Sequence, residues 1–268
     1  MNNPLENHWA LILGASSGFG AATCLELARA GMNIFGVHMD RRSTLHNVEE
    51  LSHQIKATGQ LSIFFNMNAA DSDKREAALD EMTSTLKTQD HPADIRVFLH
   101  SLAFGSLGRY FPTDSKKPIT QDQMTMTLDV MAHSLVYWVQ SLVTRTLLGK
   151  ESRIFAMTSS GGHDVWHSYG TVSAAKAALE SHIRQIALEL APLGITANSI
   201  QAGVTETPAL TKIPGYEDMV ATAMRCNPSG RMTLPEDVGK AIVALSLPQT
   251  QWITGNVIRV DGGEDITG

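Results

Sequence analysis

Residues 9–20 read WALILGASSGFG, a short apolar run that leads directly into a glycine-rich turn. The run is too short for a buried helix and is typical of a strand covered on both faces. A helical pattern follows the turn between Gly14 and Gly20. Glycines in such a strand–turn–helix unit allow a tight turn and a close approach of free N–H groups to a pyrophosphate. This stretch therefore predicts a nucleotide-binding βαβ unit at the start of the chain.

The rest of the chain continues the same alternation of short apolar runs and amphipathic stretches. We predict strands within 8–14, 33–39, 61–67, 94–101, 152–160, 195–200 and 256–263, and helices at 18–31, 43–58, 71–89, 121–149 and 168–192. Such alternation implies right-handed βαβ units in one parallel sheet. The expected fold is a single α/β domain over residues 1–268, a Rossmann-like doubly wound parallel sheet of about seven strands with helices on both faces.

The stretch 207–231 interrupts this rhythm, because it is helix-prone but contains Pro208, Pro214, Pro228, Gly215 and Gly230. We interpret it as a substrate lid, with a plain connecting loop as the alternative.

Composition excludes several classes of function. The chain of 268 residues is 43% hydrophobic and carries a net charge of -6, without a basic stripe, so we expect no nucleic-acid partner. No apolar run approaches the length of a membrane span, and no secretory signal pattern opens the chain, so we expect a cytoplasmic protein. The two cysteines lack metal-ligand spacing and the histidines are scattered, so we predict no metal site and no disulfide.

Tyr169 and Lys176 in the segment YGTVSAAK are seven residues apart at the start of a helical pattern. Seven residues make almost two helical turns, so both side chains project from one face. A nearby ammonium favours the phenolate, which lets the phenol deliver a proton near neutral pH. The pair is a candidate for acid–base chemistry, and an ordinary solvated helix face is the alternative.

The spacing GxxxGxG at residues 14–20, with its paired serines, resembles the short-chain dehydrogenase/reductase family. The resemblance extends over the whole chain and includes HSLA at 100–103, Asn198, QAGVTETP at 201–208 and VDGG at 260–263. It implies an oxidoreductase that uses NAD(H) or NADP(H).

The resemblance also implies where the cofactor lies. Its phosphates and adenosine ribose would contact Gly14, Ser16, Ser17, Gly18, Phe19 and Gly20, and its adenine would lie beside Asn68 and Ala69. The nicotinamide ribose would lie along Ser101, Leu102, Ala103 and Lys176. Thr205 would hold the carboxamide, and Thr207 would reach the pyrophosphate.

The choice between NAD and NADP depends on the end of the second strand, VHMDRRST. An acidic residue there can bind the ribose diol, whereas arginines recognise a 2′-phosphate. Asp40 falls later than the usual ribose-binding acid, which leaves Arg41 and Arg42 free to bind a phosphate. We therefore expect NADP(H), with NAD(H) as the alternative. The alternative for the two arginines is a solvated loop that binds no ligand.

The position of the tyrosine departs from the ordinary family pattern, in which it precedes the lysine by four residues. That position is Val172 here, and the usual helix asparagine is replaced by Met131. The spacing YxxxxxxK, the segment HSLAF and the motif PSGRM resemble the enoyl-acyl-carrier-protein reductase branch. The glycine loop is of the ordinary kind, as in the less common enoyl reductases that tend to use NADPH.

A displaced tyrosine suits reduction of a conjugated enoyl thioester. Three residues move it by about 4.5 Å along the helix. In this reaction hydride reaches the β-carbon, while negative charge develops on a carbonyl oxygen two carbons away. The resemblance therefore implies that Tyr169 stabilises the enolate and that Lys176 binds the nicotinamide ribose. Ser159, seventeen residues before Lys176, is either a second donor or a plain serine at a strand end.

The resemblance further implies a thioester substrate on acyl carrier protein or coenzyme A, and a homotetramer. It leaves the acyl-chain length open. Two other functions remain as alternatives, a short-chain reductase for a ketone or alcohol and a sensor that binds NADP(H) without turnover.

Overall fold

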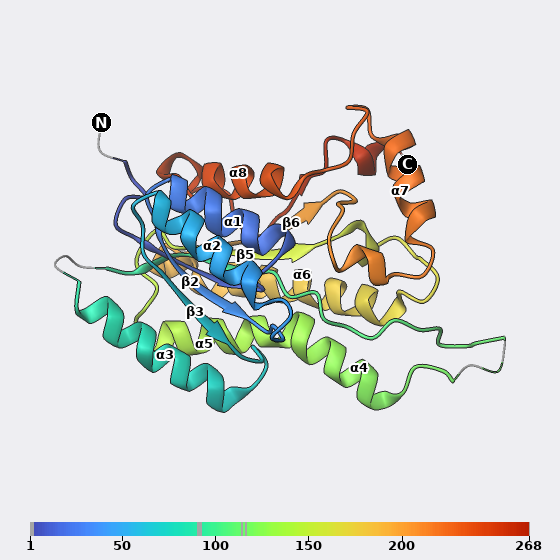
Figure 1. The fold of residues 1–268 in the computed structure, drawn as a ribbon, viewed down its shortest axis with the longest axis horizontal. Helices are drawn as coiled ribbons and strands as arrows, with labels where there is room; N and C mark the ends of the chain where they lie inside the picture. Colours follow the sequence, from blue (N-terminus) through green and yellow to red (C-terminus); the bar gives the residue numbers. More distant parts are fainter. Residues whose placement is uncertain (1–2, 90–92, 114, 116, 268) are drawn as a thin grey trace.

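The computed structural model describes residues 3–89, 93–113, 115 and 117–267 of the chain. Its centre is one parallel sheet with the strand order β3-β2-β1-β4-β5-β6-β7 (Figure 1). The strands are β1 (Trp9–Leu13), β2 (Asn33–His38), β3 (Ser62–Asn66), β4 (Ile95–His100), β5 (Arg153–Thr158), β6 (Thr196–Ala202) and β7 (Val257–Val260). The predicted doubly wound sheet is confirmed, and each predicted apolar run coincides with one of these strands, although β6 extends two residues beyond the predicted end at residue 200.

Helices cover both faces of this sheet (Figure 1). One face carries α1 (Gly18–Arg29), α2 (Leu45–Ala57) and α8 (Pro235–Leu245). The other carries α3 (Ser72–Lys87), α4 (Gln121–Leu128), α5 (Ser134–Thr144) and α6 (Gly170–Leu190). The short helix α7 (Tyr216–Cys226) lies outside these two layers, beyond the end of β6. None of the helices in the described chain is both long and apolar enough to cross a membrane.

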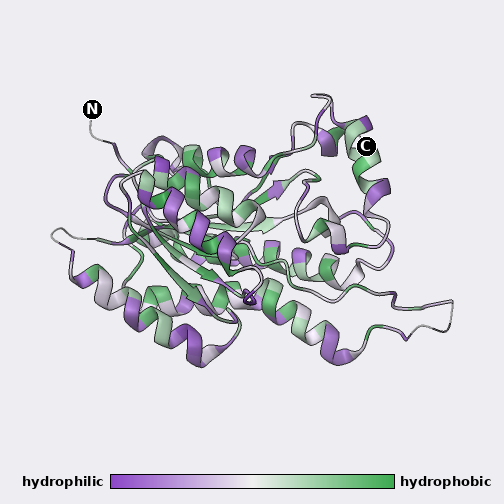
Figure 2. Ribbon diagram, in the orientation of Figure 1, coloured by the Kyte–Doolittle hydropathy of each residue, from purple (hydrophilic) through white to green (hydrophobic). Residues whose placement is uncertain are grey.

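Two hydrophobic cores follow from the period of two in each strand. In β1, Trp9, Leu11 and Leu13 belong to the core under α3, α5 and α6, whereas Ala10 and Ile12 belong to the core under α1 and α8. All five residues are fully buried. Figure 2 shows the same arrangement, with apolar strands inside and polar residues on the outer surfaces of the helices. Burial on both faces explains why β1, β2 and β5 read as nearly continuous apolar runs, whereas the edge strands β3 and β7 are partly exposed.

The structure differs from the helix predictions in two places. The predicted helix at 121–149 is divided into α4 and α5 by a π-helical turn, Asp129–His133, which buries Met131, and α5 ends at Thr144 rather than at residue 149. π-Turns inside helices often occur at functional sites. The helix α8 was not predicted, although Pro235 at its first position and two acidic residues in its first turn are helix-start signals.

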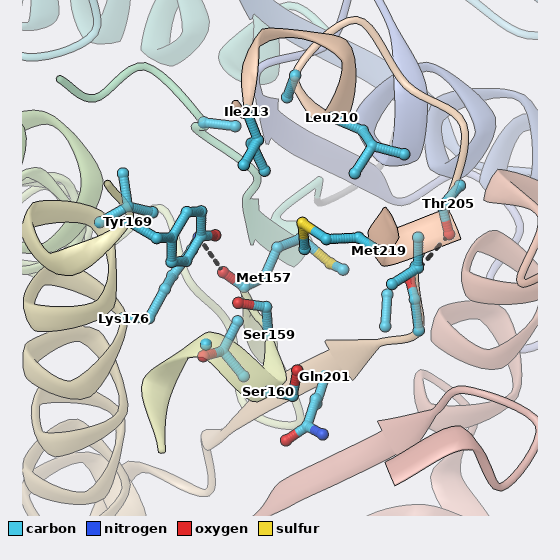
Figure 3. Close-up of a pocket in the computed structure, with 18 of the residues that line it drawn as sticks. Met157, Ser159, Ser160, Tyr169, Lys176, Gln201, Thr205, Leu210, Ile213 and Met219 are labelled. Carbon is cyan, nitrogen blue, oxygen red and sulfur yellow. Dashed lines mark hydrogen bonds between the residues drawn. The ribbon is translucent and has the colours of Figure 1, made fainter. Parts of the chain in front are cut away.

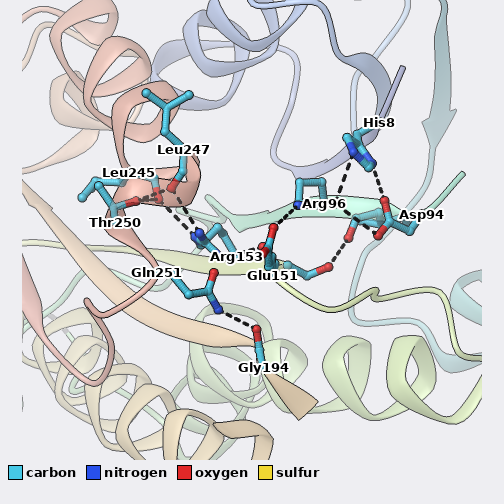
Figure 4. A network of polar contacts seen from close by, with 12 residues as sticks. His8, Asp94, Arg96, Glu151, Arg153, Gly194, Leu245, Leu247, Thr250 and Gln251 are labelled. Atoms are coloured by element: carbon cyan, nitrogen blue, oxygen red, sulfur yellow. Dashed lines mark hydrogen bonds and ion pairs between the residues drawn. The ribbon is translucent and has the colours of Figure 1, made fainter. Parts of the chain in front are cut away.

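A polar network lies at the amino ends of the strands (Figure 4). The Nδ1 atom of His8 contacts Asp94 before β4, and Arg96 pairs with Glu151 before β5 at 3.2 Å. Arg153, which is 1% exposed, donates to the carbonyls of Glu151, Leu245 and Leu247. These contacts fasten strand starts to neighbouring loops. In parallel α/β sheets ligands bind at the opposite, carboxyl ends of the strands.

Candidate functional site

A cavity of about 650 Å³ opens at the carboxyl ends of β4 to β7. One part of its wall is apolar and comes from the loop after β4, the π-turn, α6 and the 207–231 segment. This part includes Leu107, Met131, Val172, Leu210, Ile213 and Met219. The predicted lid segment therefore forms one wall of the cavity, as Figure 3 shows for Leu210, Ile213 and Met219.

The three residues predicted as catalytic lie together in this cavity. Figure 3 shows Tyr169 and Lys176 reaching from α6 toward Ser159 at the end of β5. Lys176 is 6% exposed, and its Nζ donates to the carbonyl oxygen of Met157 at 2.7 Å. Val172, at the position of the ordinary tyrosine, also lines the cavity. The structure thus places a buried apolar side chain four residues before Lys176, where the sequence analysis located the ordinary position of the tyrosine.

Backbone geometry holds Tyr169 in place. Tyr169 is the N-cap of α6, and the preceding Ser168 has a φ of 65°, a left-handed conformation that is uncommon outside glycine. The carbonyl of Ser168 accepts a hydrogen bond from the N–H of Gly108 at 2.9 Å. Gly161 packs against the ring, since a Cβ there would lie 2.5 Å from Tyr169 Cε1. The tyrosine is therefore positioned by strained backbone on one side and close packing on the other.

The ionisation of the pair differs from the sequence-based expectation. Burial raises the pKa of Tyr169, and proximity to the Ser159 hydroxyl offsets this only in part. Burial lowers the pKa of Lys176 to about 8, although Glu180 acts in the opposite direction. The expectation that the ammonium favours a phenolate was wrong, because desolvation dominates at this site. Tyr169 is a neutral hydrogen-bond donor at neutral pH.

Two further polar residues near Lys176 were not predicted. His100 at the end of β4 is fully buried, and its Nε2 lies 2.8 Å from the hydroxyl of Ser134. Glu180, one helical turn after Lys176, accepts a hydrogen bond from Thr158 at 2.6 Å. Glu180 could have been predicted to lie near Lys176, because residues four apart are neighbours on the surface of a helix.

The glycine-rich loop has the shape that a dinucleotide needs. Gly14 has a φ of +85°, and an added Cβ would collide with the carbonyl of Ser101. A Cβ on Gly18 would lie 3.2 Å from Thr207 Cγ2, so the loop and the predicted pyrophosphate ligand are adjacent. Ser17 caps α1 without a side-chain hydrogen bond, which leaves helix N–H groups for an anion. These residues fit a nicotinamide dinucleotide.

The residues predicted at the adenosine end lie on neighbouring loops. Burial would raise the pKa of Asp40, but hydrogen bonds from Thr44, Ser16 and His38 outweigh it and keep the pKa below its usual range. The Nδ1 atom of His38 lies 2.9 Å from the Asp40 carboxylate. Arg41 and Arg42 follow it, are exposed, and form no ion pair with any residue that the structure describes. Asn68 and Ala69 follow β3, next to β2 in the sheet.

Half of the predicted site residues line the cavity. It is lined by Phe19, Ser101, Leu102, Ala103, Ser159, Tyr169, Lys176, Thr205 and Thr207. The remaining predicted ligands lie outside it, in the glycine loop, the first turn of α1 and the loops after β2 and β3. They are Gly14, Ser16, Ser17, Gly18, Gly20, Arg41, Arg42, Asn68 and Ala69.

One group of potential metal ligands exists within the described ranges, although the sequence predicted none. His163, Asp164 and Asp265 offer ligand atoms within 4.8 Å of one another at the cavity wall. Asp265 already pairs with Arg259 and contacts His163 at 3.2 Å. The Asp265 carboxylate is therefore already paired with the guanidinium of Arg259.

Comparisons with known proteins identify the family. The family model described as enoyl-(acyl carrier protein) reductase matches residues 14–264. The enoyl-acyl-carrier-protein reductase (NADH) FabI of Aquifex aeolicus is 29% identical over 201 residues, which cover 73% of this chain and 72% of that protein. A cyclohexanol dehydrogenase of Acinetobacter sp. is 26% identical over 262 residues, covering 98% of this chain and 96% of that protein.

Among solved structures, the enoyl-acyl-carrier-protein reductase (NADH) from Aquifex aeolicus has the same fold, with a TM-score of 0.83 and 24% identity over 98% of both chains. A short-chain dehydrogenase from Burkholderia cenocepacia in complex with NADP has a TM-score of 0.82 at 22% identity, covering 97% of this chain and 99% of that chain. The chain belongs to the enoyl-(acyl carrier protein) reductase family of the short-chain dehydrogenases/reductases and is an NAD(P)H-dependent oxidoreductase.

Proposed function

We propose that this protein reduces the double bond of a trans-2-enoyl thioester with NADPH. The observation that carries the proposal is the displaced phenol, since Tyr169 faces the cavity seven residues before Lys176 while Val172 occupies the ordinary position. When bound, the cofactor supplies the hydride. Tyr169 then donates a hydrogen bond to the thioester oxygen, where negative charge develops. The apolar wall formed by Met131, Val172 and Met219 accommodates the acyl chain.

The other site residues have supporting roles in this proposal. Lys176 binds the nicotinamide ribose, and Ser159 is a second donor beside Tyr169. Thr205 and Ser101 line the cavity at the end where the nicotinamide would lie. The segment 207–231 acts as a lid over the substrate, and the domain spans residues 1–268. As the relatives named for acyl-carrier-protein substrates suggest, the thioester is carried by acyl carrier protein. We also propose that the active form is a homotetramer.

We further propose a preference for NADPH over NADH. The Asp40 carboxylate already accepts hydrogen bonds from neighbouring side chains and is 12% exposed, so it is poorly placed to bind a ribose diol. Arg41 and Arg42 are exposed and lie beside the same loop. Their guanidinium groups suit a 2′-phosphate. The Arg41→Ala/Arg42→Ala variant should lose kcat/KM for NADPH and retain it for NADH, and an unchanged ratio would refute the preference.

A ketone or alcohol reductase is the competing function, because a cyclohexanol dehydrogenase matches almost the whole chain. The direct test is the rate of NADPH oxidation with crotonyl thioester compared with acetoacetyl thioester. We expect turnover of the crotonyl substrate, and Tyr169→Phe should slow it at least about tenfold with unchanged cofactor affinity. Turnover of the acetoacetyl substrate alone would favour a ketone reductase. Cofactor binding without any turnover would favour a sensor.

A further inference from the structure

The turn after β6, residues 203–205, forms part of the cavity wall, and Figure 3 shows Thr205 at this wall. The hydroxyl of Thr205 donates to the carbonyl of Gly203 at 3.0 Å, a bond within the turn. The N–H of Val204, between these two residues, donates outside the turn. Its acceptor is Oε1 of Glu264 at 3.0 Å, sixty residues further along the chain. The shape of the turn therefore depends on a side chain from another part of the chain.

The position of Glu264 is fixed by its own backbone and by close packing. Glu264 begins a short 3₁₀ turn after β7, and its N–H donates to the carbonyl of Asp261 at 3.2 Å. Its carboxylate lies directly against Gly203, since a Cβ there would lie 2.9 Å from Glu264 Oε2. A larger residue at Gly203 would collide with this oxygen. One carboxylate oxygen thus receives the Val204 N–H, while the other packs against the residue before it.

Three other carboxylates line the same cavity, and none of them bonds the 203–205 turn. Asp261 accepts hydrogen bonds from two backbone N–H groups of the loop after β7, at 2.9 and 3.1 Å. Asp265 pairs with the guanidinium of Arg259. Asp164 is exposed. Among the described residues, Glu264 is therefore the one acid of the cavity wall that holds this turn.

We propose that Glu264 is a positioning residue that keeps residues 203–205 in the shape required to bind the nicotinamide carboxamide. The proposal rests on the proposed role of Thr205 in holding that carboxamide. The Val204 N–H is partly buried, and such a donor is costly without an acceptor. Without Glu264 the peptide at Val204 would turn toward another acceptor, and the neighbouring Thr205 would lose its fixed direction. Oε1 can accept this bond whether the carboxyl group is ionised or protonated, so the role requires no particular charge.

The test compares Glu264→Leu with Glu264→Gln, which keeps an acceptor oxygen. In the cofactor-free, full-length protein labelled with ¹⁵N-valine, NMR follows hydrogen exchange of the Val204 amide, with Val204→Ala to assign its signal. Glu264→Leu should speed this exchange at least about tenfold, the ordinary effect of losing one hydrogen bond to a carboxylate. Fluorescence titration uses NADPH or NADH, whichever the wild type binds more tightly, and should show an affinity about tenfold weaker. Glu264→Gln should stay within about threefold of the wild type in both measurements.

Matched variants separate this role from general damage. Glu206→Leu removes an exposed carboxylate from the same loop, one that makes no hydrogen bond within the described residues, and should leave both measurements unchanged. Glu264→Ala replaces Glu264→Leu if leucine prevents folding.

Three results would overturn the proposal. They are wild-type exchange and affinity in Glu264→Leu, a Glu264→Gln variant as defective as Glu264→Leu, and faster Val204 exchange with unchanged cofactor affinity. Neither measurement contains a thioester, so missing enoyl turnover would refute the proposed function and leave this inference standing.

Discussion

One methyl group at Gly161 should disable the site without altering any reacting group. In Gly161→Ala the new Cβ would lie 2.5 Å from Cε1 and 3.1 Å from Cδ1 of Tyr169. Carbon atoms in contact are normally at least about 3.5 Å apart, so the ring must move by about 1 Å. The backbone at Gly161 lies outside the left-handed region, so alanine itself causes no strain there. The displacement therefore falls on the tyrosine.

A shift of about 1 Å in a positioned group can cost about 100-fold in rate. This corresponds to about 2.7 kcal/mol of activation free energy. We expect such a loss in kcat for crotonyl thioester, measured as the decrease in NADPH absorbance. Cofactor affinity should remain at the wild-type value, because the new methyl group at Gly161 contacts neither the glycine loop nor Thr207.

A double variant tests whether the loss acts through the tyrosine. If it does, Gly161→Ala/Tyr169→Phe should be no slower than Tyr169→Phe alone. A fully additive loss would place the effect elsewhere in the site. A wild-type rate for the single Gly161→Ala variant would refute the close packing on which the reasoning depends.

Three further predictions concern stability and cofactor binding. Arg153→Met removes three hydrogen bonds to carbonyls and should lower the free energy of unfolding in urea by about 3 kcal/mol, with cofactor affinity unchanged. Gly14→Ala, at a φ of +85° and against the Ser101 carbonyl, should weaken NADPH binding at least about tenfold in a calorimetric titration. Burial lowers the pKa of Lys176 from 10.5 to about 8, so below pH 8 the unfolded chain holds this proton more tightly and the ammonium destabilises the fold. Lys176→Met should therefore stabilise the cofactor-free protein by up to about 3 kcal/mol at pH 7, and the gain should disappear toward pH 10.5; a gain independent of pH would contradict this.

Much of the fold could be predicted from local patterns. Seven short, mostly apolar runs became seven strands, because parallel strands covered on both faces are rich in apolar residues. The glycine loop could be placed because its sequence lies between such a strand and a helix. The offset of Tyr169 from Lys176 could be counted along one helix, since residues seven apart share a face. α8 was missed although its start signals were present.

The electrostatic character of the site required the tertiary structure. A local pattern contains no burial depth, so the sequence alone suggested that Lys176 would favour a phenolate at Tyr169. The structure buries both groups, and desolvation raises the pKa of the Tyr169 phenol and lowers the pKa of the Lys176 ammonium.

Three features could be predicted from the sequence, because each depends on residues close together in the chain: the alternation of strands and helices, the nucleotide loop and the pairing of Tyr169 with Lys176. The convergence of His100, Thr158 and Glu180 around that lysine could not be predicted, because these residues come from β4, β5 and α6. Their convergence depends on how separate strands and a helix pack, and no spacing along the chain records it.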